Sequence, residues 1–309
     1  MTRSLPVRTA PRGSTLHHSS GSRSGAQERW ESETMNRACK IFLMVLGLVV
    51  VSVTAARETP AAEVAPLLKY YAKDYWVLLG GSHGDKWLTP EAVAPKLMGG
   101  EEYRVYAPFT FLRKATGGKA GPWGEADPEF LVRMKPVDKS GKDVLAVGGS
   151  WDAMPRRPRI VERNFEPYVN AARDILKTRA IHAPKVKITR VAEIDLDGDG
   201  ENEVLVSAEH FSGRSALDSP KPGDFSMVFL RKTARGRASD TLLDGFFRTS
   251  TETDEGPSTT WRIVNVLDCN GDGVMEIVVG YAYYEGGGAA VYRIKGDAVE
   301  KVLGVDWGL

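Results

Sequence analysis

Two copies of one acidic loop, each placed between apolar runs, constrain the fold of this 309-residue chain more than any other feature. Residues 194–203 read IDLDGDGENE and are followed by the apolar run Val204–Val206. Residues 267–276, at a spacing of 73, read LDCNGDGVME and are followed by Ile277–Val279. Residues 227–232 (MVFLRK) and 290–295 (AVYRIK) also match one another. The sequence therefore predicts a tandem repeat in which β-strands flank each loop.

Alternate residues of each loop carry the oxygen atoms that calcium prefers, so we predict two calcium ions. Calcium takes six to eight oxygen ligands at about 2.3–2.6 Å, and glycine at position 6 allows the positive φ that turns the chain around an ion. The expected ligands are the side chains of positions 1, 3, 5 and 9 and the carbonyl of position 7. In the first loop these are Asp195, Asp197, Asp199, Glu203 and the carbonyl of Glu201. In the second they are Asp268, Asn270, Asp272, Glu276 and the carbonyl of Val274.

Two other kinds of loop share the Asp- and Gly-rich composition of these segments. An EF-hand loop requires a bidentate Glu at position 12, where this chain has Val206 and Val279. It also requires flanking helices, whereas the flanks here are rich in Val and Ile, so an EF-hand is excluded. A metal-free turn built from Asp and Gly remains the open alternative.

The pattern Asp-x-Asp-Gly-Asp-Gly-x-x-Glu between strands resembles the calcium loop of FG-GAP and VCBS-type repeats, known from integrin-α propellers and exported bacterial proteins. The resemblance covers about residues 186–303 and implies calcium bound through positions 1, 3, 5, 7 and 9. The chain departs from the family in lacking the Phe-Gly and Gly-Ala-Pro segments and in having Glu at position 9. Two repeats cannot close a seven-bladed propeller, so we expect an incomplete propeller-like sheet pair or a small sandwich.

The two loops are expected to differ in calcium affinity. The first offers four ligand carboxylates and the second three, because Asn270 is neutral, and fewer charges generally mean weaker binding. Calorimetric titration of Asp268→Ala, which retains the first loop, should therefore show tighter binding than titration of Asp195→Ala. Equal affinities in the two variants would contradict the ranking.

The amino-terminal residues have the pattern of an export signal. An apolar run at residues 41–53 follows Arg37 and Lys40 and precedes small residues that suit a signal peptidase. We therefore expect a signal peptide at 35–56, after a polar extension at 1–34 that suggests Met35 rather than Met1 as the true start. A retained membrane span would need about 20 apolar residues and is the alternative. The expected location is periplasmic, cell-surface or extracellular.

The rest of the chain is expected to be α+β and mainly β, in three parts. Residues 57–160 should form a small α+β region, with a helix at 61–72, strands at 75–79, 103–106 and 144–147, and a loop at 115–124. Residues 161–184 should form a linker helix, amphipathic over 167–179, and residues 185–309 the β-rich repeats. Pro155–Arg159 is expected to be a solvated linker, because its two prolines and three arginines resist regular structure.

We expect a non-enzymatic binding or structural module that acts on an unknown protein or glycan ligand. The 41 basic and 40 acidic residues nearly cancel, which argues against nucleic acid as a partner. One alternative is an exported hydrolase with its site in residues 57–160, because Gly80–Gly84 matches G-x-S-x-G around Ser82. Another is a calcium-assisted glycan-binding module that uses Tyr281, Tyr284 or Tyr292.

Overall fold

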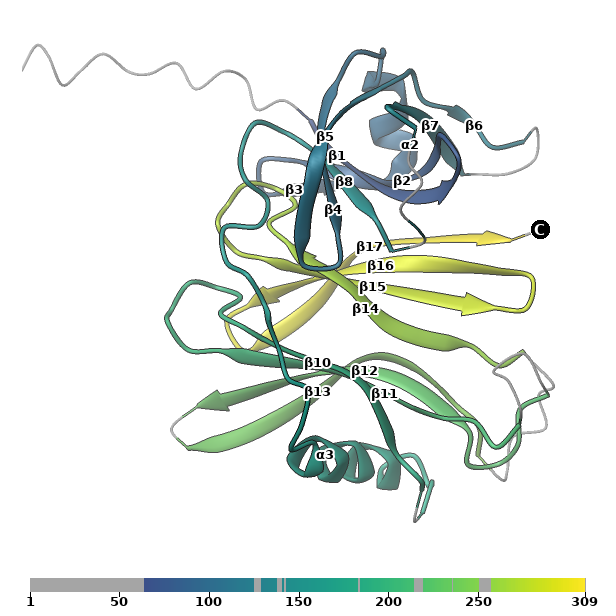
Figure 1. Ribbon diagram of the computed structural model, residues 1–309, viewed down its shortest axis with the longest axis vertical. Coiled ribbons are helices and arrows are strands. Elements are labelled where there is room, and N and C mark those ends of the chain that lie inside the picture. The colour runs from purple at the N-terminus through teal and green to yellow at the C-terminus, as the bar shows by residue number, and fades with distance from the viewer. Residues whose placement is uncertain are drawn as a thin grey trace, which may run out of the picture. The chain divides into compact units, whose positions relative to one another are not determined.

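The computed structural model describes residues 64–124, 129–137, 141, 143–182, 184–213, 219–234, 236–249 and 257–308. The expected extension at 1–34 and signal peptide at 35–56 lie outside these residues. Within the described ranges, no helix is both long enough and apolar enough to span a membrane. The described part is mainly β, as expected (Figure 1).

The first part of the described chain is a closed six-stranded antiparallel barrel. Its strand order is β2-β1-β8-β4-β5-β7, and the pairing of β2 with β7 closes the ring and removes its free edges. The ring strands are β1 (Ala65–Ala72), β2 (Tyr75–His83), β4 (Glu102–Ala107), β5 (Thr110–Gly117), β7 (Phe130–Lys135) and β8 (Leu145–Gly148). Two short strands pair with ring strands: β3 (Lys86–Leu88) pairs with β2, and β6 (Gly121–Pro122) pairs with β7.

The barrel differs from the expectations for residues 57–160 in three respects. The only described helical segments there are α2 (Pro90–Val93) and a 3-10 turn (Ala94–Lys96), so the described part of this region is mainly β rather than α+β. The helix expected at 61–72 is wrong, because Ala65–Ala72 is strand β1. Leu67 and Leu68 are both fully buried in different apolar clusters, which shows that β1 is covered on both faces. The expected loop at 115–124 is also wrong in part, since it contains the end of β5 and all of β6.

The remainder forms two antiparallel sheets, each built around a four-stranded meander (Figure 1). Sheet B has the order β13-β12-β11-β10-β9, and sheet C has the order β14-β15-β16-β17. The strands of sheet B are β9 (Arg159–Ile160), β10 (Lys187–Ile194), β11 (Glu203–His210), β12 (Phe225–Ala234) and β13 (Arg237–Phe247). Those of sheet C are β14 (Thr260–Leu267), β15 (Glu276–Tyr283), β16 (Gly286–Lys295) and β17 (Ala298–Gly308).

The two meanders correspond strand for strand. Each of the first two strands of the sheet B meander begins and ends 73 residues before its counterpart in sheet C, as β10 does relative to β14. Each of the last two strands begins and ends 61 residues before its counterpart, as β12 does relative to β16. The two acidic loops therefore occupy the same connection, between the first and second strands. The predicted helix at 167–179 matches α3 (Glu166–Lys177), which buries Ala172 and Leu176 in the apolar cluster of sheet B.

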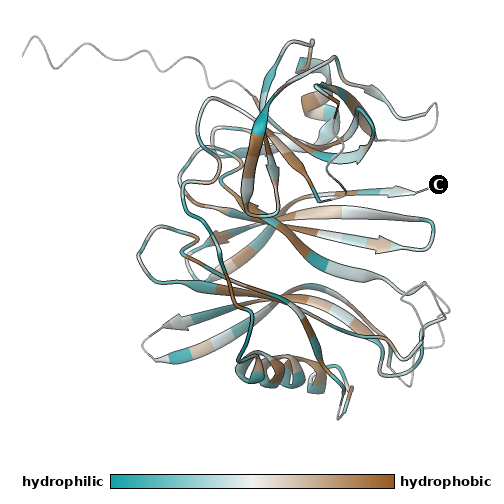
Figure 2. Cartoon of the chain, in the orientation of Figure 1, coloured by the Kyte–Doolittle hydropathy of each residue, from teal (hydrophilic) through white to brown (hydrophobic). Residues whose placement is uncertain are grey.

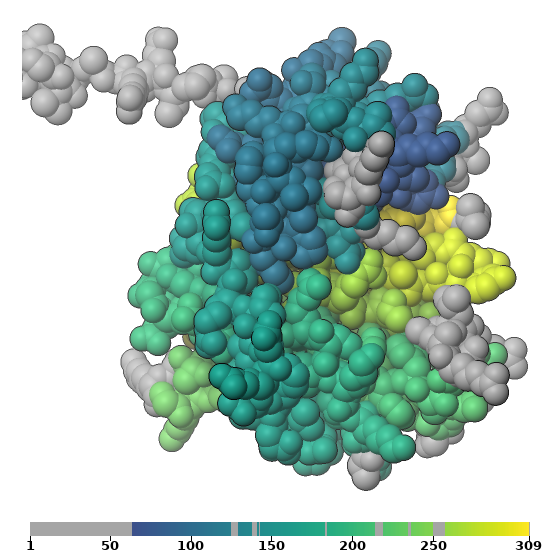
Figure 3. All heavy atoms as spheres, in the orientation of Figure 1, coloured from purple at the N-terminus to yellow at the C-terminus, as the bar shows by residue number. Residues whose placement is uncertain are grey.

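One continuous apolar cluster joins the barrel, sheet B and sheet C. It includes Leu67 and Val77 of the barrel, Leu205 of β11 and Val279 of β15. Figure 2 shows hydrophobic residues along the middle of the strands, and Figure 3 shows atoms of the barrel in contact with those of sheet C. The positions of the acidic loops are thus fixed by a shared core.

An ion pair between the barrel and sheet C should make stability depend on acid pH. Arg262 in β14 donates from Nε to both carboxylate oxygens of Asp143 at 3.1 Å and from Nη2 to Oδ1 at 2.8 Å. Burial opposes ionisation of Asp143, but the hydrogen bonds and charge of Arg262 outweigh it and hold the pKa below its usual 3.8. The ionised pair therefore stabilises the fold above the usual pKa, and this contribution is lost as the pH falls through the folded-state pKa.

Asp143→Asn is expected to lower the free energy of unfolding by about 1 kcal/mol near neutral pH, because the pair is partly exposed. Urea titrations at a series of pH values check this. The difference between the variant and the wild type should shrink below about pH 4. A difference that stays constant down to the acid limit would contradict the assignment.

Candidate functional site

The first acidic loop turns around the carboxylate of Asp195, at the end of β10. Its Oδ1 accepts a hydrogen bond from the N–H of Gly198 at 2.6 Å, and its Oδ2 accepts one from Gly200 at 3.1 Å. Both glycines have positive φ, 83° and 90°, which favours glycine over residues with a Cβ. The local sequence thus folds the loop so that position 1 lies at its centre.

The second loop has the same hydrogen bonds at the same positions. Asp268 accepts from Gly271 at 2.6 Å and from Gly273 at 3.0 Å. Position 5 also repeats, because Asp199 accepts from the N–H of Glu201 and Asp272 from that of Val274, each at 2.8 Å. The two loops therefore have the same conformation, set by the same residue types.

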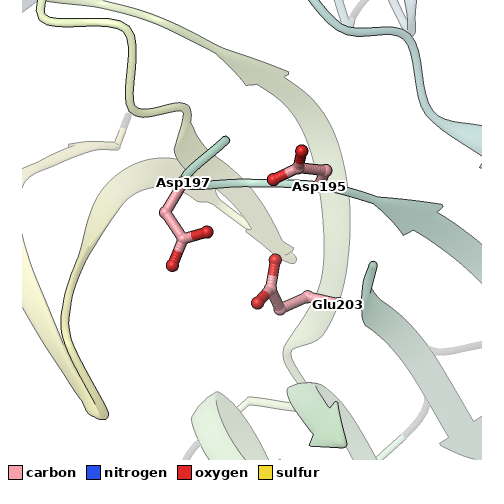
Figure 4. Close-up of side chains that lie close together, drawn as sticks. All are labelled: Asp195, Asp197 and Glu203. Atoms are coloured by element: carbon pink, nitrogen blue, oxygen red, sulfur yellow. The ribbon is translucent and has the colours of Figure 1, made fainter. Parts of the chain in front are cut away.

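Three carboxylates of the first loop converge (Figure 4). Asp195, Asp197 and Glu203 each have a carboxylate oxygen, and these oxygens lie within 4.8 Å of one another. Glu203 reaches this group from the start of β11, where its Oε2 accepts a hydrogen bond from the N–H of Leu196 at 3.0 Å. Asp199 and Glu201 are not part of this group, so their predicted roles as ligands stay predictions.

The second loop contains a buried carboxylate oxygen that no described residue contacts by a hydrogen bond. Glu276 is fully buried; its Oε2 accepts from the N–H of Cys269 at 2.8 Å, while its Oε1 has no hydrogen-bond partner in the described part of the chain. Burial, aided by the nearby charges of Asp272 and Asp268, raises the pKa of Glu276 to about 8. Leaving such an oxygen unsatisfied is costly. A cation bound among these carboxylates would satisfy it.

The donor atoms suit a hard cation. The predicted side-chain ligands are seven carboxylates and the amide of Asn270, position 7 offers a main-chain carbonyl, and calcium prefers carboxylate and carbonyl oxygens. Cys269 is not a competing thiolate ligand, because its buried Sγ donates to the carbonyl of Leu267 at 3.4 Å and burial raises the pKa of its thiol. Burial also raises the pKa of Glu203 and of Asp268. These carboxylates, one in each loop, therefore resist ionisation, and a bound divalent ion would offset their negative charge.

The segment expected to be a solvated linker contacts both loops. Arg156 donates to the carbonyls of Asp195, Leu196 and Gly273. Trp151, five residues earlier, donates from Nε1 to the carbonyl of Asp268 at 2.9 Å. Sequence reasoning missed these contacts because they join residues 39 to 117 positions apart. No local pattern around residue 156 could have revealed them.

The described residues do not form the expected nucleophile elbow, and they expose one of the three expected glycan-binding tyrosines. Ser82 is buried within strand β2, paired with Ala65 and Trp87, rather than exposed on a strand-to-helix turn. Tyr292 is buried and donates to Asp244 at 2.7 Å, and Tyr281 packs on Trp261 at 4.4 Å between ring centres. Of the expected glycan-binding tyrosines, Tyr284 is the exposed one, at 70%.

Comparisons of the chain with models of protein families, with curated proteins and with solved structures found no match.

Proposed function

We propose that this chain is an exported, calcium-binding protein whose two loops each hold one ion, and that it acts as a non-enzymatic binding or structural module. The buried Oε1 of Glu276, which has no partner among the described residues, carries the proposal: the N–H of Cys269 occupies only Oε2, and a metal-free turn would leave Oε1 buried and unsatisfied. The shared conformation of the two loops supports extending it to the first loop. Export rests on the signal-like residues 35–56.

The proposed architecture is an incomplete propeller-like pair of repeats, joined to a barrel. The strand-for-strand correspondence of sheets B and C supports the repeat, as does the placement of each loop between first and second strands. Extracellular calcium-binding modules have dissociation constants of about 10⁻⁴–10⁻³ M, a range that matches calcium levels outside cells. At such levels the ions would rigidify the connections that hold the sheets, and a protein or glycan would bind elsewhere.

Calcium titration of the purified protein, combined with elemental analysis, tests the proposal. We expect two ions per chain, one lost in Asp195→Asn and the other in Asp268→Asn. Asp297→Asn is the matched control, because this acidic residue lies in the turn between β16 and β17 and outside both loops. Binding of neither ion at millimolar calcium would overturn the proposal. Magnesium at the same concentration should bind more weakly, because it demands near-ideal octahedral geometry.

A further inference from the structure

One guanidinium group lies between the two acidic loops. Arg156 donates from Nε to the carbonyl of Asp195 at 2.6 Å and from Nη2 to that of Leu196 at 2.9 Å. The same Nη2 donates to the carbonyl of Gly273, in the second loop, at 2.6 Å. A planar fork of donors with fixed geometry is suited to such a shared contact, which a single ammonium group could not reproduce.

Main-chain hydrogen bonds also connect the two loops to each other and connect the second loop to the segment that carries Arg156. The N–H of Met275 in the second loop donates to the carbonyl of Leu196 in the first at 2.8 Å. Residues 151–156, here called the bridging segment, hold the second loop at position 1: the N–H of Asp268 donates to the carbonyl of Ala153 at 2.8 Å. The main chain at position 1 of both loops is therefore tied to one short segment.

These contacts provide a route by which the ordering of one loop can affect the other. An ion orders the loop that binds it, and an ordered loop holds its shared hydrogen-bond partners in place. The second ion then binds a loop whose partners are already ordered, so less conformational entropy is lost. Repulsion between the two ions opposes this effect, but the three or four carboxylates of each loop offset the charge of its ion, and salt screens the remainder.

Building on the proposed calcium function, we propose that the bridging segment makes the two loops a positively cooperative pair and that Arg156 is the residue that positions them. Couplings between sites are typically 5- to 150-fold in affinity. Occupancy of the first loop should therefore tighten binding at the second at least fivefold.

Trp151 supplies a signal specific to the second loop. Its ring packs against Gly271, where an added Cβ would meet ring carbon Cδ2 at 3.0 Å, and its Nε1 bonds to Asp268. Terbium, a luminescent ion that occupies calcium sites, can be excited through this ring. The concentration at half-maximal luminescence then reports binding at the second loop, and Trp151→Phe should remove most of the signal.

The experiment measures this midpoint in the full chain with and without Asp195→Asn, which disables the first loop. With Arg156 in place, Asp195→Asn should raise the midpoint at least fivefold. In an Arg156→Met background the same change should raise it less than twofold. Arg157→Met is the matched control, because Arg157 is exposed and makes no hydrogen bond to either described loop. In this background, Asp195→Asn should still raise the terbium midpoint at least fivefold.

A second variant separates geometry from charge and from loss of folding. Arg156→Lys keeps the charge but lacks the planar fork, so it should fold and yet lose most of the dependence; full dependence would overturn the assignment to the guanidinium group. If both loops of the unsubstituted chain bind an ion, and Asp195→Asn leaves the terbium midpoint of the second loop unchanged or lowers it, cooperativity is overturned while the calcium function stands. If neither loop binds an ion, both proposals are overturned.

Discussion

Removal of calcium is expected to lower the midpoint of thermal unfolding by about 10 °C or more. At free calcium 100-fold above the dissociation constant, each site adds about 2.7 kcal/mol to the free energy of unfolding. For a domain of this size, each kcal/mol moves the midpoint by about 2–4 °C. Two occupied loops therefore account for the shift, which calorimetry at free calcium 100-fold above the measured dissociation constants and in excess chelator would measure.

Variants divide this shift between the loops. Asp195→Asn and Asp268→Asn should each lose a large part of it, whereas Asp297→Asn should keep it whole. Glu276→Gln keeps the shape of the buried side chain and can still accept from the N–H of Cys269, but it cannot supply the charge. Its midpoint in calcium should fall, while its midpoint in chelator should hold or rise, because a buried carboxylate is penalised more than an amide.

Equal midpoints in calcium and in chelator, in protein shown by elemental analysis to be metal-free after chelation, would contradict the calcium assignment. The loops would then be ordinary Asp and Gly turns.

Asn265→Ala should lower the free energy of unfolding by about 2–4 kcal/mol. Asn265 is fully buried in β14, where its Nδ2 donates to the carbonyl of Ala107 at 2.8 Å and its Oδ1 accepts from the N–H of Phe109 at 3.2 Å. Truncation leaves both main-chain groups of the β4–β5 turn without these partners. Phe109 also has a φ of 61°, which is unfavourable for a residue with a Cβ and must be held by its surroundings.

Chemical denaturation of Asn265→Ala beside Asn170→Ala checks this expectation. Asn170 is exposed on α3, so its truncation should change stability by less than about 0.5 kcal/mol. Similar small effects in both variants would show that the barrel and sheet C are not joined through Asn265.

The acidic loops and their flanking strands could be predicted because their information is local. Asp195 is three residues from Gly198 and five from Gly200, and these short spacings determine which N–H groups donate hydrogen bonds to its carboxylate. The burial of Glu276 could be anticipated less well, since it depends on the packing of sheet C. The absence of a hydrogen bond to its Oε1 could be found only in the structure.

The barrel and the bridging segment were missed because their contacts are distant in sequence. The barrel closes when Tyr75 pairs with Arg133, and no motif around either residue indicates that pairing. Strand β1 was mistaken for a helix because apolar residues buried on both faces of a strand lose the alternation that identifies strands. Arg156 lies between two prolines in a polar run, and only the fold brings its guanidinium to the loops.

The unequal offsets of the two meanders, 73 residues for the first two strands and 61 for the last two, locate the whole difference in length in one hairpin. The connection from β11 to β12 is twelve residues longer than that from β15 to β16, where Tyr284 and Glu285 alone join the strands. The same meander thus accommodates a short or a long connection at this point. For protein engineering, the Tyr284–Glu285 hairpin is the natural place to insert an affinity tag or a reporter domain, because the entropic cost of a longer loop grows slowly with its length.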